Sequence, residues 1–143
     1  MRILLFITML SSCTINSHKI NIEDIESYHA RGLANAQLTE YKKAIADFNI
    51  VIQLDPEYVI AYYNRALAYY GLGKYQKSLE DFDKSIILKP NLSDAYANRA
   101  NVYFNMKQYG QALIDYNRAI ELNPLDTKSR NNIGRLYKIL QEN

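Results

Sequence analysis

The chain of 143 residues contains one cysteine, three prolines, five glycines and no tryptophan. A single cysteine can form neither an internal disulfide nor a thiolate-rich metal site, so a disulfide scaffold and a zinc ribbon are excluded. The scarcity of proline and glycine favours long helices joined by short loops. No apolar run reaches the roughly 18 residues that a membrane-spanning helix needs. These absences together predict a helical domain without a permanent transmembrane helix.

The chain also lacks a strong excess of charge of either sign. Its 17 basic and 15 acidic residues give a net charge of +2 and alternate along the sequence. A protein that holds nucleic acid through its phosphates is normally more basic, with the charge gathered on one face. We therefore expect no nucleic-acid partner. The composition, 48% hydrophobic and 22% charged, is that of a chain that folds.

Patterns for catalysis and for cofactor binding are missing as well. The segment Gly71–Lys74, GLGK, lacks the full spacing and the following Ser or Thr of a phosphate-binding loop. His18 and His29 do not have the spacing of metal ligands, and no nucleophile, base and orienting residue can be recognised together. We expect no enzyme, no cofactor and no metal.

The first twelve residues have the order of a secretory signal. Arg2 precedes the apolar run Ile3–Leu10, and small polar residues follow. The ending LSSC at Leu10–Cys13 resembles the bacterial lipoprotein signal, which implies cleavage after residue 12 and acylation of Cys13. Acyl chains hold a domain at a bilayer with about 0.8 kcal/mol per buried methylene. The alternative is a plain signal or a buried N-terminal helix in which Cys13 is incidental.

Residues 13–24 are polar and lack helical periodicity, so we expect a flexible tether. Such a tether spans roughly 18 Å and would keep the folded part close to the membrane. Thr14 stands where the resembling signals carry Asp for retention in the inner membrane. The resemblance therefore implies an exported protein on the periplasmic or cell-surface side, anchored by lipid, with the outer membrane favoured.

A period of 34 residues runs through the rest of the chain. It is carried by Pro56, Pro90 and Pro124; by Leu54, Leu88 and Leu122; by Tyr41, Tyr75 and Tyr109; and by Asp47, Asp81 and Asp115. Within a unit, Tyr62, Ala66 and Tyr69 follow a helical step, and Gly71–Tyr75 supplies a turn. Each unit is therefore a helix, a turn and a helix. One such pair cannot bury its apolar stripe alone, whereas stacked pairs bury a continuous core.

These columns resemble the tetratricopeptide repeat (TPR). The family's aromatic, small and proline positions are met in the second unit by Tyr62, Ala66, Tyr69, Ser78, Phe82, Ser85 and Pro90. The first unit departs at Asn35, where the family has an aromatic residue. The resemblance implies an all-α, right-handed solenoid of three helix-turn-helix repeats at 25–58, 59–92 and 93–126, followed by a capping helix at 127–143.

In TPR proteins the first helix of each pair lines a concave face, which implies a peptide-binding groove in this chain. The residues that fall on its wall are Tyr63, Asn64, Leu67, Tyr70, Asn98, Asn101, Phe104, Asn105, Asn132 and Arg135. Asn64, Asn98 and Asn132 form a column of amides, which donate and accept and so suit an extended backbone. The aromatic residues would anchor a partner, and the basic end would meet a carboxylate or an acidic segment.

TPR domains that clamp a C-terminal carboxylate use Lys, Asn and Arg residues from three repeats. The corresponding positions of the first helix hold His29 and Leu33, and the third repeat offers Asp94 and Asn98. The clamp is incomplete, so we do not expect a receptor for chaperone tails. We also expect the arginines that follow the amides, Arg65 and Arg99, to pair locally.

We therefore predict a non-enzymatic scaffold for protein–protein interaction. It would be a membrane-anchored TPR lipoprotein that binds a peptide segment in its groove and helps to assemble an envelope complex. One alternative is a structural module that associates with itself as a homo-oligomer. Another is a soluble adaptor resembling a co-chaperone, if the N-terminus is not a lipoprotein signal.

Overall fold

The computed structural model describes residues 22–142. The predicted signal, Cys13 and most of the predicted tether lie outside this range. Within it there are seven helices and no strand, namely α1 (Ile22–Gln37), α2 (Tyr41–Leu54), α3 (Val59–Gly71), α4 (Tyr75–Leu88), α5 (Ser93–Asn105), α6 (Tyr109–Leu122) and α7 (Thr127–Gln141). The predicted all-α fold of helix pairs with a final helix is confirmed.

Helix α1 begins earlier than the sequence indicated. Residues 22–24, which were assigned to the tether, form its first turn. Glu23 and Asp24 lie in this turn, where negative side chains interact favourably with the positive end of the helix dipole. A single polar turn has no apolar stripe, so periodicity alone did not reveal it.

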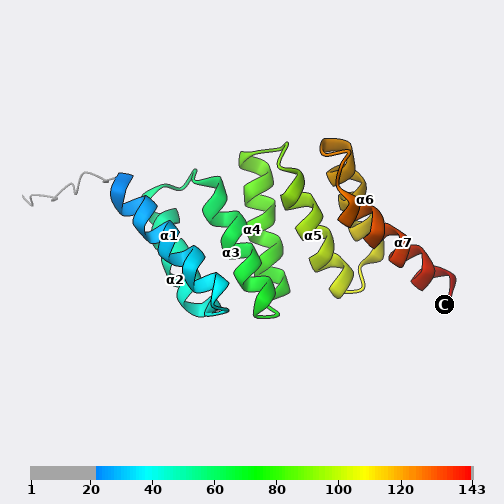
Figure 1. Cartoon of the computed structure of the whole chain (residues 1–143), viewed down its shortest axis with the longest axis horizontal. Helices are drawn as coiled ribbons and strands as arrows, with labels where there is room; N and C mark the ends of the chain where they lie inside the picture. The colour runs from blue at the N-terminus through cyan, green and yellow to red at the C-terminus, as the bar shows by residue number, and fades with distance from the viewer. Residues whose placement is uncertain (1–21, 143) are drawn as a thin grey trace, which may run out of the picture.

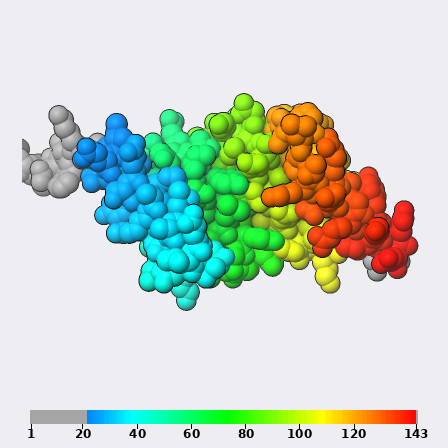
Figure 2. All heavy atoms as spheres, in the orientation of Figure 1, coloured from blue at the N-terminus to red at the C-terminus, as the bar shows by residue number. Residues whose placement is uncertain are grey.

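The helices form antiparallel pairs that stack along the long axis of the molecule (Figure 1). The colours of the atoms follow the order of the chain along the same axis (Figure 2). The pairs are α1 with α2, α3 with α4 and α5 with α6, and each second helix also contacts the first helix of the next pair. Helix α1 further contacts α3, and α3 contacts α5. The first helices therefore lie side by side along one surface of the stack.

Small residues allow the two helices of a pair to approach closely. A Cβ atom added to Gly32 of α1 would lie 2.6 Å from Cε1 of Phe48 in α2, which is too close. In the next pair the hydroxyl of Ser78 donates to the backbone oxygen of Ala66 at 2.8 Å. Ala100 is fully buried, and it belongs to a core cluster with Tyr116 of α6. The buried residues form four clusters along the stack, and Tyr103 packs against two of them, those of Phe82 and of Tyr116.

An arginine–aspartate pair joins the two helices of every repeat. The guanidinium of the first helix donates through two nitrogens to a carboxylate of the second, with Nη2–Oδ1 distances of 2.5 Å for Arg31 and Asp47, 2.6 Å for Arg65 and Asp81, and 2.8 Å for Arg99 and Asp115. All three carboxylates are buried. We call these pairs the Arg–Asp ladder. Local pairing of Arg65 and Arg99 was predicted and is present.

The ladder also joins one repeat to the preceding one. Nη1 of Arg99 donates to Asp83 of α4 at 2.6 Å, and Nη1 of Arg65 donates to Asn49 of α2 at 2.6 Å. Burial lowers the pKa of the Arg99 guanidinium, but the hydrogen bonds and the charges of Asp115 and Asp83 outweigh it, so the pKa lies above its ordinary value. Each central arginine therefore fixes three successive helices with a charge that does not titrate.

Helix α7 is held differently from the other helices. It has Ile133 at the position of the ladder arginines, and it begins with a side-chain cap, in which Asp126 accepts from the backbone nitrogen of Ser129 at 3.0 Å. Helices α2–α6 have no side-chain cap hydrogen bond. Local capping thus stabilises the one helix of residues 22–142 that contributes neither an arginine nor an aspartate to the ladder.

The turn inside each repeat needs a residue in the left-handed conformation. Thr39, Gly73 and Lys107 occupy this position at the 34-residue spacing, with φ angles of 59°, 70° and 59°. Glycine adopts this conformation without a steric penalty, whereas a β-branched threonine does so poorly. The backbone is therefore strained in the first and third turns, whereas it is unstrained in the second.

We expect Thr39→Gly and Lys107→Gly each to raise the free energy of unfolding by about 0.5–1 kcal/mol, because they relieve this backbone strain. Gly73→Ala, the reverse change at the same turn position, should lower the free energy by about 1 kcal/mol. Urea denaturation followed by circular dichroism measures all three. Destabilisation by both glycine substitutions would contradict the assignment of strain.

The ladder generates a second prediction. Asp115→Ala removes the buried partner of Arg99, whose side chain is only 17% exposed. The loss should be about 3 kcal/mol, because the largely buried charge of Arg99 then keeps only the half-exposed carboxylate of Asp83. Asp47→Ala is the matched control, since the side chain of Arg31 is 61% exposed and can turn to water. In chemical denaturation, Asp47→Ala should lower the free energy of unfolding by less than half as much as Asp115→Ala does. Equal losses would mean that burial of the arginine does not set the cost.

Candidate functional site

The ten residues predicted to line the groove all come from α3, α5 and α7, the first helices of the repeats and the final helix. Eight of them are half-buried, while Asn105 and Arg135 are exposed. Three cavities occupy this surface, and every one of the ten residues lines at least one of them. The structure thus brings the predicted residues together on one surface, which we call the groove.

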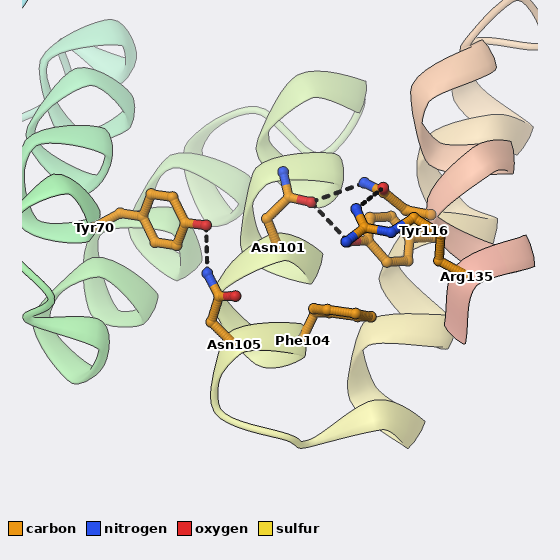
Figure 3. Close-up of a pocket in the computed structure, with 7 residues that line it drawn as sticks. Tyr70, Asn101, Phe104, Asn105, Tyr116 and Arg135 are labelled. Carbon is orange, nitrogen blue, oxygen red and sulfur yellow. Dashed lines mark hydrogen bonds between the residues drawn. The ribbon is translucent and has the colours of Figure 1, made fainter. Parts of the chain in front are cut away.

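The first cavity, the polar pocket, lies between α3, α5 and α7 and has a volume of about 120 Å³ (Figure 3). Its lining residues are Tyr70, Asn101, Phe104, Asn105, Tyr116, Asn132 and Arg135. Arg135 carries the only charge among them, and its guanidinium lies 5.7 Å from the centre of the Phe104 ring. The pocket therefore combines one cation, three amides and an aromatic face.

Hydrogen bonds in the polar pocket converge on one amide oxygen. Oδ1 of Asn101 accepts from the hydroxyl of Tyr116 at 2.6 Å and from Nδ2 of Asn132 at 3.1 Å. Burial raises the pKa of Tyr116 to about 12, so its hydroxyl stays protonated and remains a donor. No hydrogen bond from Nδ2 of Asn101 to another described residue accompanies these two, so this nitrogen can donate to a ligand.

Two further cavities belong to the groove. One, of about 280 Å³, lies between α3, α5 and α7 and combines Tyr63, Asn98 and Asn132 with the charged residues Asp94, Asp126 and Lys128. The other, of about 310 Å³, lies toward α1 and is lined by Leu33, Ala36, Gln37, Tyr41, Asn64, Leu67 and Ala68. The groove therefore changes from largely apolar near α1 to polar near α7.

The amide column of Asn64, Asn98 and Asn132 does more than the sequence suggested. Nδ2 of Asn98 donates to the hydroxyl of Tyr63 in the preceding repeat at 2.9 Å and to the backbone oxygen of Asp94 at 2.9 Å. Asn64 is 3.1 Å from the ring of His29, again one repeat earlier. These amides link neighbouring first helices, so part of their hydrogen-bonding capacity is already used inside the protein.

His29, at one of the clamp positions of the first helix, is an uncharged ring. Burial lowers the pKa of His29, so its imidazole is neutral at pH 7. The ring centroid lies 5.3 Å from that of Tyr58 and 6.0 Å from that of Phe48. His29 therefore packs as an aromatic residue at the apolar end, where the clamp would need a cation.

Sequence reasoning missed Tyr116, which reaches the groove from a second helix. Its column holds Phe48 and Phe82 in the other repeats, which indicates a core position. Its ring is indeed buried, but its hydroxyl donates into the polar pocket. The replacement of phenylalanine by tyrosine in a buried column was the available signal, because a buried hydroxyl requires a partner.

Within residues 22–142, no group of three or more His, Cys, Asp or Glu side chains is arranged to hold a metal ion. No helix in that range is both long enough and apolar enough to cross a bilayer.

Family comparisons cover most of the repeats. Sequence models described as tetratricopeptide repeat match residues 59–92 and 93–125, and one described as TPR repeat matches residues 37–73. No match was found among curated protein sequences.

Solved TPR domains share the fold. The first TPR of Spaghetti (RPAP3), bound to the HSP90 peptide SRMEEVD, is 23% identical with a TM-score of 0.80, and the match covers 85% of this chain and 96% of that one. The Arabidopsis OM64 TPR domain is 25% identical with a TM-score of 0.79, covering 81% and 96%. The Sgt2 TPR domain from Aspergillus fumigatus is 24% identical with a TM-score of 0.78, covering 85% and 82%.

Proposed function

The chain belongs to the tetratricopeptide repeat family, and from this we propose that it is a non-enzymatic scaffold that binds a segment of a partner protein in its groove. The observation that carries the proposal is the composition of the groove. An apolar cavity at one end and a polar pocket with a single cation at the other suit a peptide that has an apolar part and an acidic or carboxylate-bearing part.

A similar domain gives this proposal support. The first TPR of Spaghetti is bound to a peptide, SRMEEVD, which contains three acidic and two apolar residues. The present chain differs at the apolar end, where neutral His29 and Leu33 lie, so a cationic clamp for a chaperone tail is not proposed there. Arg135, the cation of the polar pocket, lies at the opposite end of the groove, on α7, and so does Lys128. We expect the acidic part of the ligand to lie at that end.

The proposed cellular setting rests on the N-terminal sequence. The segment LSSC at Leu10–Cys13 supports an exported lipoprotein that is anchored through Cys13, with the outer membrane favoured in a two-membrane bacterium. The scaffold would then help to assemble a complex of the cell envelope. These residues lie outside the described range, so the anchor needs its own experiment.

Binding to the groove is tested with peptides selected from a random display library on the immobilised full chain. The selected peptides should bind with roughly micromolar affinity, because ordering a flexible segment consumes much of the contact energy. Tyr70→Ala and Phe104→Ala should each weaken binding by about tenfold or more, since both remove an aromatic anchor. Arg135→Glu should weaken acidic peptides most strongly at low salt.

Lys84→Glu on α4 is the charge-matched control, because Lys84 lines none of the groove cavities. Thermal melts check that each variant is folded, and titration calorimetry measures binding. If Lys84→Glu abolishes binding while the groove variants bind like the parent, the outer surface is the working one. Sedimentation of the free protein tests the alternative of self-association, which requires a stable homo-oligomer that buries the groove.

The lipid anchor is tested by expression in a bacterium with and without Cys13→Ala. The parent should be found in the membrane fraction with an acylated N-terminal Cys13, whereas the variant should be released or remain unprocessed. Mass spectrometry of the mature parent gives the decisive reading. An intact Met1 at its N-terminus would contradict the lipoprotein proposal and leave a soluble adaptor as the function.

A further inference from the structure

Helix α7 carries the surface that a first helix uses to hold a second helix. The small residues Gly32, Ala66 and Ala100 recur at the 34-residue spacing, and Gly134 of α7 is the next member of this column. In the three repeats a second helix covers the position. Phe48 of α2 lies against Gly32, Ser78 of α4 bonds to Ala66, and the Ala100 cluster includes Tyr116 of α6.

At Gly134 this position is open. A Cβ atom added there would meet no atom of the described residues within 4 Å. About one and two turns further along α7, Tyr137 and Leu140 are 50% and 51% exposed. The equivalents of Tyr137, which are Tyr69 and Tyr103, are half-buried in their repeats. No helix in residues 22–142 covers this face of α7, and none of its residues lines the groove cavities.

The repeats themselves indicate what kind of helix fits. The covering helices α2, α4 and α6 each present a small residue followed four positions later by an aromatic one. These pairs are Ala44 and Phe48, Ser78 and Phe82, and Ala112 and Tyr116. Each also places an aspartate directly before the aromatic residue, which pairs with the ladder arginine. Helix α7 has Ile133 instead of that arginine. A helix docked on α7 therefore needs an uncharged residue in place of the aspartate, directly before its aromatic residue.

Charge distinguishes a foreign helix from a second copy of this chain. Helix α7, with the sequence TKSRNNIGRLYKILQ, has four basic residues and no acidic one. Arg130 and Lys138 stand one turn on either side of Gly134, so they flank the open position. Two α7 helices packed face to face would repel each other, whereas an acidic helix would be attracted.

We propose that the Gly134–Tyr137–Leu140 face of α7 is a second interaction surface, which binds an acidic amphipathic helix of a partner protein. The docked helix would complete a fourth helix pair. It would present a small residue to Gly134, and an aromatic residue four positions later would pack beside Tyr137. This surface is separate from the groove, and its occupation does not depend on the groove ligand.

The probe is a dye-labelled synthetic peptide of residues 75–88, the α4 sequence, carrying Lys77→Glu and Asp81→Ala so that it is acidic and uncharged before Phe82. Its fluorescence anisotropy is followed as the full chain is added. Saturable binding is expected. The same peptide with Phe82→Ala should bind about tenfold more weakly, because it lacks the aromatic anchor.

Gly134→Leu should weaken binding by about tenfold or more, because it fills the position that the docked helix must approach. Gly110→Leu on α6 is the matched control, since a Cβ there also meets no atom within 4 Å, and it should bind like the parent. Lys138→Glu should weaken binding mainly at low salt. Thermal melts should show both glycine variants folded, because leucine favours helix over glycine.

Four results would overturn the proposal. The first is the absence of saturable binding, and the second is equal binding by the parent and Gly134→Leu. The third is loss of binding in Phe104→Ala with no change in Gly134→Leu, which would place the peptide in the groove. Sedimentation that shows a dimer of the parent, lost in Gly134→Leu, would identify a second copy as the occupant and would also contradict it.

Discussion

The arginine–aspartate pair is the interaction on which the arrangement of the repeats depends. Arg65 and Arg99 each bind the second helix of their own repeat and the second helix of the repeat before it. Both guanidinium groups are largely buried, so their positions are fixed by partners and not by water. This repeated contact sets the angle and spacing between successive pairs, and it leaves the first helices side by side.

The groove follows from that arrangement. Because α1, α3 and α5 are neighbours, residues far apart in sequence come together, and bonds such as Asn98 to Tyr63 join one first helix to the next. The amides thus hold the surface in shape and also present polar groups to a ligand. Asn101 shows both roles, since its oxygen is bound twice within the protein while its nitrogen can donate outward. A pre-organised surface of this kind loses less entropy when a peptide binds.

Much of this structure was accessible from the sequence, because period and spacing are local properties of the chain. The 34-residue columns predicted the helix pairs, and the family resemblance placed ten groove residues that the structure does bring together. The first turn of α1, the hydroxyl of Tyr116 in the polar pocket and the open face beside Gly134 were not predicted. The first turn of α1 has no apolar stripe that periodicity could reveal. The sequence indicated only that a buried Tyr116 hydroxyl needs a partner, and the open face depends on what lies opposite Gly134 in space.

The central claim is that the groove, and not the outer face of the solenoid, contacts the partner. Its most direct test is a photo-crosslinking amino acid, placed in intact cells either at Phe104 in the groove or at Ile87 on α4, which is 72% exposed. We predict a discrete adduct from the Phe104 position, lost when Arg135→Glu is added, and none from Ile87. Adducts from Ile87 alone would contradict the account.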